Sequence, residues 1–458
     1  MKLMADKVYF LGIGGIGMSA LARYFRMKGW SVAGYDRTPT PLTAALEKDG
    51  IAVDYTDAAE RIPEEFRAPD TLVVYTPAIP ADSPEKNWFS SNGFKLHKRA
   101  EVLGLLSSRG KALCVAGTHG KTTTTTLLAY LLERSEVGCN AFLGGISRNY
   151  NTNLLLDEKS EYIVVEADEY DRSFLHLTPY IAAITAMDDD HMDIYGTRES
   201  MLDAFAQYAS QVCSGGCIIV RKDLETDVRF RSMPVAVETY GVERQDAGYY
   251  AKNLRIEEGR YIFDYVSRDF IIDDLCLGIP GRMNVENAVL AITMALKSGV
   301  SADEIRSALP GFAGVVRRFN IHAVSGRDVY ADDYAHHPEE IKATLNVARE
   351  MYSDRLLTVV FQPHLYTRTR DLCEGFAESL SLADRVILTD IYPAREEPIP
   401  GVSSEMILER LNTAGVLVPK ENLLKYLDSN FEGGVLITLG AGNIDALVPG
   451  IAEWMKNR

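Results

Sequence analysis

The sequence predicts an α/β protein in which strands and helices alternate and build parallel sheets. This prediction rests on three stretches, residues 7–28, 111–133 and 435–443. In each of them a short apolar strand is followed by a glycine-containing loop that leads into a helix. Strands that alternate with helices are joined by crossovers and therefore lie parallel. A chain of 458 residues has room for about three domains of ordinary size.

The first of these stretches has the pattern of a dinucleotide-binding domain. A strand at residues 7–11 leads into Gly12–Gly17, which reads GIGGIG and contains G-x-G-x-x-G, and a second strand at residues 31–35 ends at Asp36. In such domains the glycines admit a diphosphate and the acid binds a ribose hydroxyl. Alone, the pattern predicts an NAD enzyme, although the same loop holds any diphosphate, and glycines used only for packing remain the alternative.

The rest of the first third continues the same fold. A strand around Val73–Tyr75 ends in a loop that contains Thr76, and an amphipathic helix that carries Lys98 and Arg99 reaches about Ser107. The carboxyl ends of parallel strands border the ligand crevice, so the loop with Thr76 is expected to face it. The polar residues 107–110 read as a linker to a second domain.

The second stretch is typical of a phosphate-binding loop. A buried strand at residues 112–116 precedes the loop and an apolar helix follows it; the loop residues are Gly117, Thr118, His119, Gly120, Lys121, Thr122 and Thr123. Backbone N–H groups at a helix start bind phosphate, the lysine neutralises β/γ oxygens, and the threonine hydroxyl binds Mg²⁺. The usual first glycine is replaced by Val115, so the loop is a shortened one. A glycine turn before an ordinary helix is the alternative.

Acidic residues end two further strands of the predicted central sheet. Residues 162–165 lead into Glu166, and residues 181–186 lead into an acidic segment that contains His191. Acids at the tip of a buried strand hold Mg²⁺ in phosphate-loop enzymes. Thr122, Glu166 and His191 are therefore predicted metal ligands, with an ordinary surface loop as the alternative for His191.

Polar residues also mark a helix farther along and the last third of the chain. Asn284 and Asn287 lie one turn apart on a helix predicted over residues 285–297; either one alone could be a helix cap. In the last third, strands at residues 356–361, 386–388 and 435–439 are followed by loops rich in His, Arg and Gly. Such clusters at strand ends favour a ligand face.

Composition excludes several other classes of protein. The formal net charge of −16 argues against general binding of nucleic acid or anionic membranes, which reward a basic surface. The six cysteines are scattered, which suggests neither a disulfide framework nor a zinc site. No apolar run is long enough to span a membrane, and the N-terminus has no signal region, so we expect a soluble cytoplasmic protein.

Segments from all parts of the chain resemble the Mur ligase family of peptidoglycan synthesis. They are GIGGIGMSALA (Gly12–Ala22), GTHGKTTTT (Gly117–Thr125), EADEYDRSFLHL (Glu166–Leu177), DDDHMDIY (Asp188–Tyr195), GRMNVENA (Gly281–Ala288), GVVRRF (Gly314–Phe319), DDYAHHP (Asp332–Pro338), FQPHLYTRTR (Phe361–Arg370) and GAGNI (Gly440–Ile444). Within the family, the members that add L-alanine are most similar. The resemblance implies ATP-driven joining of L-alanine to UDP-N-acetylmuramate through an acyl phosphate, with Mg²⁺ (or Mn²⁺ in its place).

The resemblance also implies a domain plan and a set of site residues. A Rossmann-like domain at 1–107 would bind the UDP-sugar rather than NAD, a phosphate-loop ATPase-type domain at 108–316 would bind ATP and Mg²⁺, and a Rossmann-like domain at 317–458 would bind the amino acid and close over the cleft. The implied UDP-sugar residues are Gly14, Gly15, Ile16, Gly17, Asp36, Thr76 and Arg99. The implied catalytic residues are Lys121, Glu166, His191, Arg318 and Asp333, and ATP would also meet the loop residues, Asn284, Asn287 and Arg318. His337 and Arg368 would bind the amino acid.

Two departures and three rival functions remain at this level. Met283 stands where the family usually has His, and Leu365 where it often has Arg. A ligase that recycles murein tripeptide onto UDP-N-acetylmuramate would share the same ATP chemistry. An NAD-linked oxidoreductase would leave the phosphate loop unexplained, and an ATP-driven switch protein would form no amide. We expect a monomer or a homodimer.

Overall fold

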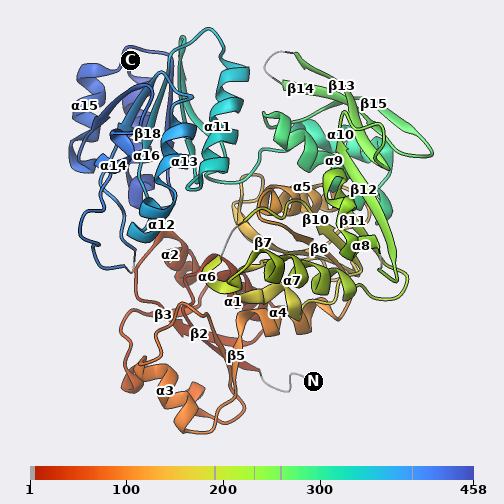
Figure 1. The fold of residues 1–458 in the computed structure, drawn as a ribbon. Helices are drawn as coiled ribbons and strands as arrows, with labels where there is room; N and C mark the ends of the chain where they lie inside the picture. Colours follow the sequence, from red (N-terminus) through yellow and green to blue (C-terminus); the bar gives the residue numbers. More distant parts are fainter. Residues whose placement is uncertain (1–5, 190–191, 232, 258–259, 395) are drawn as a thin grey trace. The chain divides into compact units, whose positions relative to one another are not determined.

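The computed structural model describes residues 6–189, 192–231, 233–257, 260–394 and 396–458, which form three sheets (Figure 1). The first is a five-stranded parallel sheet of order β3-β2-β1-β4-β5. Its strands are β1 (Lys7–Leu11), β2 (Ser31–Tyr35), β3 (Ala52–Asp54), β4 (Leu72–Tyr75) and β5 (Leu96–Lys98), and its helices are α1 (Ile16–Met27), α2 (Pro41–Lys48), α3 (Pro84–Ser91) and α4 (Arg99–Ser107).

The second sheet has ten strands in the order β15-β14-β13-β12-β11-β10-β6-β9-β7-β8. The strands are β6 (Lys111–Ala116), β7 (Asn140–Ser147), β8 (Thr152–Leu155), β9 (Tyr162–Glu166), β10 (Ile181–Ile184), β11 (Cys217–Arg221), β12 (Ala236–Val242), β13 (Tyr249–Glu257), β14 (Arg260–Val266) and β15 (Ile271–Cys276). The helices are α5 (Lys121–Glu133), α6 (Met192–Tyr195), α7 (Arg198–Ser210), α8 (Val228–Arg231), α9 (Arg282–Lys297) and α10 (Ala302–Ala308). The strands from β7 through β9, β6, β10, β11 and β12 to β13 are parallel, whereas β8, β14 and β15 pair antiparallel.

The third sheet has six strands in the order β16-β17-β21-β18-β19-β20, with only the β16–β17 pair antiparallel. Its strands are β16 (Asn320–Ser325), β17 (Asp328–Asp333), β18 (Leu357–Phe361), β19 (Arg385–Leu388), β20 (Ala414–Leu417) and β21 (Val435–Leu439). Its helices are α11 (Pro338–Met351), α12 (Tyr366–Asp371), α13 (Cys373–Leu380), α14 (Glu405–Leu408), α15 (Leu423–Asn430) and α16 (Val448–Lys456). The alternation predicted from the sequence is confirmed for most of the three sheets, but β7–β9, β12–β15 and β16–β17 follow one another without a helix between them.

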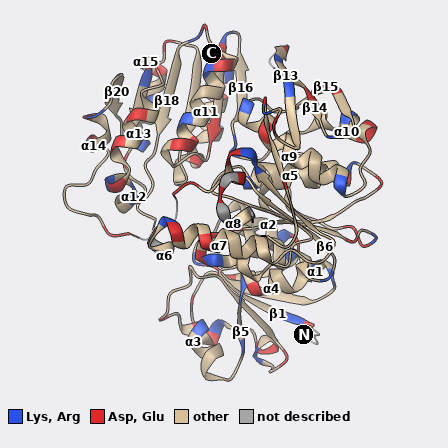
Figure 2. Ribbon diagram, turned by 45° about the vertical axis from the view of Figure 1, so that its right-hand side comes forward, with Lys and Arg blue, Asp and Glu red and all other residues tan. Residues whose placement is uncertain are grey.

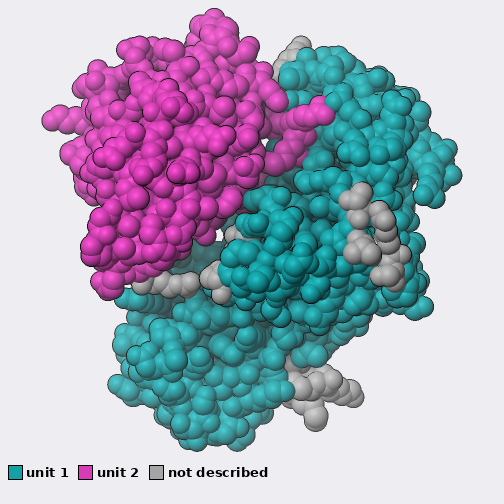
Figure 3. All heavy atoms as spheres, viewed as in Figure 1, with its two compact units in different colours: residues 1–278, 284–313 teal, residues 279–283, 314–458 magenta. Residues whose placement is uncertain are grey.

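The chain divides into two compact units (Figure 3). Unit 1 contains residues 1–278 and 284–313 and carries the first two sheets, and unit 2 contains residues 279–283 and 314–458 and carries the third. The predicted domain boundaries at 107/108 and 316/317 stay predictions.

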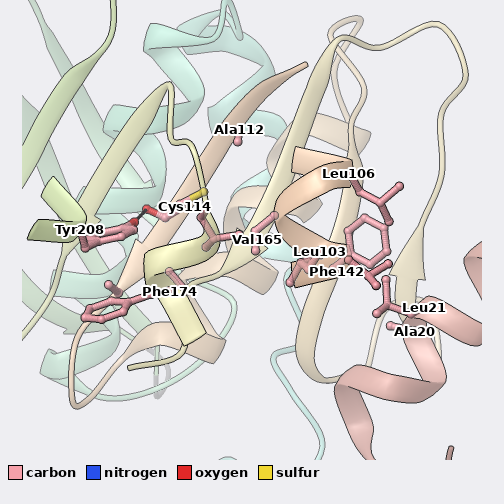
Figure 4. Close-up of a cluster of buried hydrophobic side chains, with 14 of the residues drawn as sticks. Ala20, Leu21, Leu103, Leu106, Ala112, Cys114, Phe142, Val165, Phe174 and Tyr208 are labelled. Carbon is pink, nitrogen blue, oxygen red and sulfur yellow. Dashed lines mark hydrogen bonds between the residues drawn. The ribbon is translucent and has the colours of Figure 1, made fainter. Parts of the chain in front are cut away.

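One apolar core extends across both sheets of unit 1 (Figure 4). Leu21 of α1 and Leu103 of α4 belong to it together with Phe142 of β7 and Cys114 of β6, and all four are buried. The Tyr208 hydroxyl donates a hydrogen bond of 3.0 Å to the Cys114 carbonyl inside this core. Because buried apolar area is the main stabilising contribution, this shared core fixes the first sheet against the second.

Charged residues lie mainly on helices and loops, and the inner strands of the sheets carry few (Figure 2). Strands covered on both faces by helices are largely apolar, as β6, β10 and β21 are. In the described part of the chain, no helix has the length and apolar character needed to cross a membrane.

Candidate active site

The strand register brings three loops of the second sheet to one edge. Ala116 at the end of β6 pairs with Ile184 at the end of β10, and Val115 pairs with Glu166 at the end of β9. The segments that follow these strands therefore begin at the same level. They carry the predicted phosphate loop, the Glu166 acids and the start of the acidic segment after β10, so the phosphate-loop residues and Glu166 gather at this edge.

The β6–α5 loop has the strand–loop–helix form predicted from the sequence. Gly120 precedes α5 in a left-handed conformation with φ of 81°. A Cβ atom at this position would lie 2.6 Å from Asn287 Oδ1. Asn287 is held in place because its Nδ2 donates to Asn284 Oδ1 at 3.3 Å and its Oδ1 accepts from the Thr124 hydroxyl at 3.3 Å. Both predicted asparagines are thus next to the phosphate loop.

Lys121, the first residue of α5, is enclosed by acceptors. Its Nζ donates to the Gly117 carbonyl at 2.6 Å and to both Glu169 carboxylate oxygens at 2.7 and 2.8 Å. The Glu169 side chain is 1% exposed. Burial lowers the pKa of Lys121, but attraction to Glu169 and the neighbouring acids outweighs it, so the pKa is raised and the lysine stays charged. Glu169 was not predicted as a site residue, although it lies in the EADEYD segment.

The remaining loop residues are held against the segment after β10. The Thr118 amide donates to the Ala186 carbonyl at 3.1 Å, and the Thr118 hydroxyl donates to the Asp188 carboxylate at 3.4 Å. His119 Nε2 lies 3.6 Å from the same carboxylate. Thr123 is buried within α5. These contacts fix the loop backbone next to the end of β10.

Glu166 and Thr122, two of the predicted metal ligands, lie next to each other. The Thr122 hydroxyl donates to Glu166 Oε1 at 3.0 Å, and the carboxylate fills the space that a side chain at Gly144 would need. Carboxylate and hydroxyl oxygens suit a hard cation such as Mg²⁺, which takes one or two protein oxygens and completes its shell with phosphate and water. Among the described residues no group of three His, Cys, Asp or Glu side chains is arranged to hold a metal. His191, the third predicted ligand, lies outside the described residues.

A pocket in unit 1 connects the first glycine loop with Glu166. Five of the predicted UDP-sugar residues line it: Gly15, Ile16, Gly17, Thr76 and Arg99. Glu166, Asp168 and Gly144 line the same pocket from the second sheet. The Arg99 guanidinium lies 3.7 Å from the Asp168 carboxylate, across the junction of the two sheets. The first glycine loop and the acids at the end of β9 therefore line one pocket.

Gly14 and Asp36 are outside the residues that line this pocket. The Gly14 amide donates to Asp36 Oδ2 at 2.7 Å, and the Thr38 amide donates to Asp36 Oδ1 at 3.1 Å. In this structure the Asp36 carboxylate therefore binds the backbone of the glycine loop and of the segment after β2. Its predicted contact with the UDP-sugar stays a prediction.

In unit 2, Asp333 and Arg318 lie close together near the end of β17. The Asp333 carboxylate accepts from the backbone amides of Phe319 at 2.7 Å and Ala335 at 2.8 Å. Burial raises the pKa of Asp333 to about 6, although the Arg318 charge and the two amides oppose this rise. Arg318 also lies 3.5 Å from Glu340 of α11.

The predicted amino-acid residues of unit 2 lie at the same sheet edge, because β17 and β18 flank β21 and the three strands end in register. Arg368 of α12 contacts His364 Nδ1 at 3.3 Å, and the His364 ring centroid is 6.2 Å from that of His336. His337 precedes α11 as its N-cap. His336 and His364 lie in the DDYAHHP and FQPHLYTRTR segments, but the sequence did not predict them as site residues. The pair of adjacent histidines and the histidine before Leu365 are the sequence features that could have indicated them.

The two departures from the family pattern occupy element starts. Met283 is 43% exposed on the first turn of α9. Leu365 adopts a left-handed backbone with φ of 71° before α12, and its carbonyl accepts from the Thr369 amide at 3.1 Å.

Comparisons with known proteins agree over nearly the whole chain. The family profiles described as "Mur ligase family, catalytic domain", "Mur ligase middle domain" and "Mur ligase, glutamate ligase domain" match residues 7–111, 115–295 and 317–442. The UDP-N-acetylmuramate–L-alanine ligase of Phocaeicola vulgatus is 52% identical over 98% of each chain. That of Porphyromonas gingivalis strain W83 is 50% identical over 98% of this chain and 99% of the relative.

Solved structures show the same architecture. The UDP-N-acetylmuramate–alanine ligase of Thermotoga maritima matches with a TM-score of 0.82 at 28% identity, over 98% of this chain and 99% of that one. A murein peptide ligase of Psychrobacter arcticus shares the fold, with a TM-score of 0.69 at 21% identity over 99% of both chains. The three-part α/β fold expected from the sequence is confirmed, and this chain belongs to the Mur ligase family.

Proposed function

We propose that this chain is an ATP-dependent ligase that joins L-alanine to the lactyl carboxylate of UDP-N-acetylmuramate and releases ADP and phosphate. The relatives that are about half identical over almost the full chain carry that name, and the family resemblance read from the motifs agrees with it. We further propose that the enzyme works in the cytoplasm, as a monomer or a homodimer, because its proposed substrates are soluble nucleotides and an amino acid.

The observation that carries this proposal is the pocket that joins the first glycine loop to the Glu166 strand end. A UDP-sugar whose diphosphate lies along Gly15–Gly17 and Arg99 can extend its sugar toward Glu166. From there its carboxylate reaches the side of the phosphate loop, where ATP is expected. An oxidoreductase that used the glycine loop for NAD would have no use for this continuity.

The proposed reaction activates the carboxylate with ATP. A carboxylate oxygen attacks the γ-phosphorus, the bond between that phosphorus and the ADP oxygen breaks, and an acyl phosphate forms. The neutral amine of L-alanine then attacks the acyl carbon, the amide forms as phosphate leaves, and the amine releases a proton. Lys121 offsets charge on the transferring phosphoryl group, and Asn284 and Asn287 contact the nucleotide.

Two substrate anions must approach each other in the first step. Thr122 and Glu166, with His191 as the predicted third ligand, would hold Mg²⁺, which when bound screens the carboxylate from the γ-phosphate. We assign Arg318 and Asp333 to support of the phosphoryl transfer, and His337 and Arg368 to the L-alanine carboxylate. The His336–His364–Arg368 cluster supports a carboxylate site at that edge, because cationic and N–H donor groups converge there.

The direct test is phosphate release from ATP and Mg²⁺ in the presence of UDP-N-acetylmuramate, with and without L-alanine. Release that needs both substrates, with a product mass that equals the amide, supports the proposal. Release that needs murein tripeptide instead of L-alanine would retain the ATP chemistry and overturn the alanine assignment. A change in nicotinamide absorbance with NAD would overturn both.

The role of Lys121 gives a sharper prediction. Lys121→Ala removes the cation at the start of α5, and we expect turnover to fall by at least about a thousandfold, because charge on the phosphoryl group is left uncompensated. The measurement is L-alanine-dependent phosphate release.

Lys111→Ala is the matched control. Lys111 is the first residue of β6, at the end of that strand opposite the phosphate loop, and its Nζ lies 2.7 Å from the Glu161 carboxylate on the surface. This variant is expected to keep its activity. Substantial ligase activity in Lys121→Ala would contradict the role given to Lys121.

A further inference from the structure

Glu169 and the Gly117 carbonyl together use the whole hydrogen-bonding capacity of Lys121. An ammonium group has three donors, and here they go to the Gly117 carbonyl and to the two Glu169 oxygens, all within 2.8 Å. The lysine side chain is 14% exposed and that of Glu169 is 1% exposed. The cation predicted to bind the nucleotide is therefore already bound by an anion of this chain.

Glu169 is held in this position by contacts that do not involve Lys121. The Glu169 carbonyl accepts from the Tyr195 hydroxyl at 2.7 Å and from the Arg172 amide at 3.0 Å. The Phe174 amide donates to the Asp168 carbonyl at 2.9 Å. The carboxylate is thus presented to the lysine by a fixed loop, which limits the entropy lost when the pair forms.

A nucleotide phosphate and the Glu169 carboxylate compete for the same donors. A β- or γ-phosphate oxygen that binds Lys121 must replace at least one existing acceptor, and two anions on one buried cation repel each other. A lysine without an anion in this buried place would be costly, so one partner or the other is expected at all times.

We propose that Glu169 is a positioning residue that stands in for the nucleotide phosphate on Lys121. It holds the lysine ammonium directed at the loop while the site is empty, and it gives up the lysine when ATP binds. This inference rests on the proposed ATP-dependent function. It means that part of the ATP binding energy goes into opening the Lys121–Glu169 pair, which lowers the observed affinity.

The test compares nucleotide affinities of the full-length wild-type chain and Glu169→Gln by isothermal titration calorimetry. The variant keeps the shape of the side chain and removes its charge. We expect it to bind Mg-ATP about tenfold more tightly than the wild type, with a correspondingly lower KM for ATP. AMP, which lacks the phosphates that would reach Lys121, should bind both proteins equally.

Asp171→Asn is the matched control. It removes one negative charge from the same loop, but Asp171 pairs with Lys98 at 2.7 Å and not with Lys121. ATP affinity is expected to stay at the wild-type value in this variant. Glu169→Asp keeps the charge on a shorter side chain, so its ATP affinity should fall between those of the wild type and Glu169→Gln.

The outcomes separate this inference from the proposed function. If the wild type binds ATP and Glu169→Gln binds it equally or more weakly, with AMP binding unchanged, the stand-in role is wrong and the ligase function stands. If Glu169→Gln does not fold, as judged by its urea midpoint, Glu169→Asp decides: tighter ATP binding supports the exchange, and unchanged or weaker binding overturns it. A wild type that binds no ATP would overturn both.

Discussion

Glu85 of α3 is a buried carboxyl group next to the first sheet, and it is not one of the predicted site residues. Its side chain has no exposed surface, and its Oε2 accepts a hydrogen bond of 2.9 Å from the Tyr9 hydroxyl. Within the described residues, Oε1 has no hydrogen-bond partner. Burial raises the pKa of Glu85 to about 7; repulsion from Asp57 adds to this rise, and the Tyr9 hydrogen bond opposes it.

This raised pKa predicts a pH-dependent stability. Between about pH 4.5 and 7 the unfolded chain loses the Glu85 proton while the folded chain keeps it. The free energy of unfolding therefore falls as pH rises through this window, by about 2–3 kcal/mol for this group, and levels off above it. In Glu85→Gln the side chain stays neutral, so urea unfolding at pH 5, 6, 7 and 8 should show that decline reduced.

Glu65→Gln is the control for this measurement, because Glu65 is exposed in the same domain. It should leave the pH dependence of unfolding unchanged. A decline that is as steep in Glu85→Gln as in the wild type would place its origin in other groups.

The contacts between site residues were the feature least predictable from the sequence. Lys121 and Glu166 could be predicted from their motif, because a lysine after a glycine loop and an acid at a strand tip each have a local signature. Their contacts depend on strand order: β9 lies next to β6, and only that adjacency brings Glu169 to Lys121. The same holds for Arg99 and Asp168, which meet across two sheets.

At the scale of elements, the β6–loop–α5 unit depends on a glycine at its joint. Gly120→Ala would force an L-residue into φ of 81° and place its Cβ 2.6 Å from Asn287 Oδ1. We expect a loss of about 2–4 kcal/mol in the free energy of unfolding, from backbone strain and displacement of Asn287 together. ATP affinity should fall as well, because the loop amides and Asn287 move. Urea unfolding and calorimetry measure the two effects.

Gly215→Ala separates the two causes. Gly215 has nearly the same backbone, with φ of 82°, but nothing lies within 4 Å of a Cβ placed there. It should lose only the strain contribution of about 1–2 kcal/mol and keep its ATP affinity. Equal losses in the two variants would show that the contact with Asn287 contributes nothing.

The parallel strands were predictable because burial on both faces makes them largely apolar, as in β1, β6 and β21. The antiparallel extension β13–β15 was not predicted. Its exposed face carries charged residues. The register of the β13–β14 pair shifts between positions Lys252 and Arg255 of β13, and that of the β14–β15 pair shifts between Phe263 and Tyr265 of β14. Such irregularities break the period of two by which a half-exposed strand is found in a sequence.

At the scale of the whole molecule, the predicted ATP-binding and catalytic residues are divided between the two units. The phosphate loop, Glu166, Asn284 and Asn287 belong to unit 1, and Arg318 and Asp333 belong to unit 2. Unit 1 has its own extended core, and unit 2 has cores on both faces of its sheet. A unit with a core of its own is expected to fold alone.

A fragment of residues 1–313 should therefore fold, bind ATP and fail to ligate. Its shared core and phosphate loop are complete, so we expect cooperative urea unfolding and an affinity for Mg-ATP within about tenfold of the full chain. L-alanine-dependent phosphate release should be absent, because Arg318, Asp333, His337 and Arg368 are missing.

The same fragment with Lys121→Ala is the control. It should lose ATP binding while its urea unfolding midpoint stays within a few tenths of a molar of that of the unmodified fragment. Ligation by the fragment would show that the residues after 313 are not needed for the chemistry, and a fragment that folds but binds no ATP would show that unit 2 supplies part of the nucleotide site.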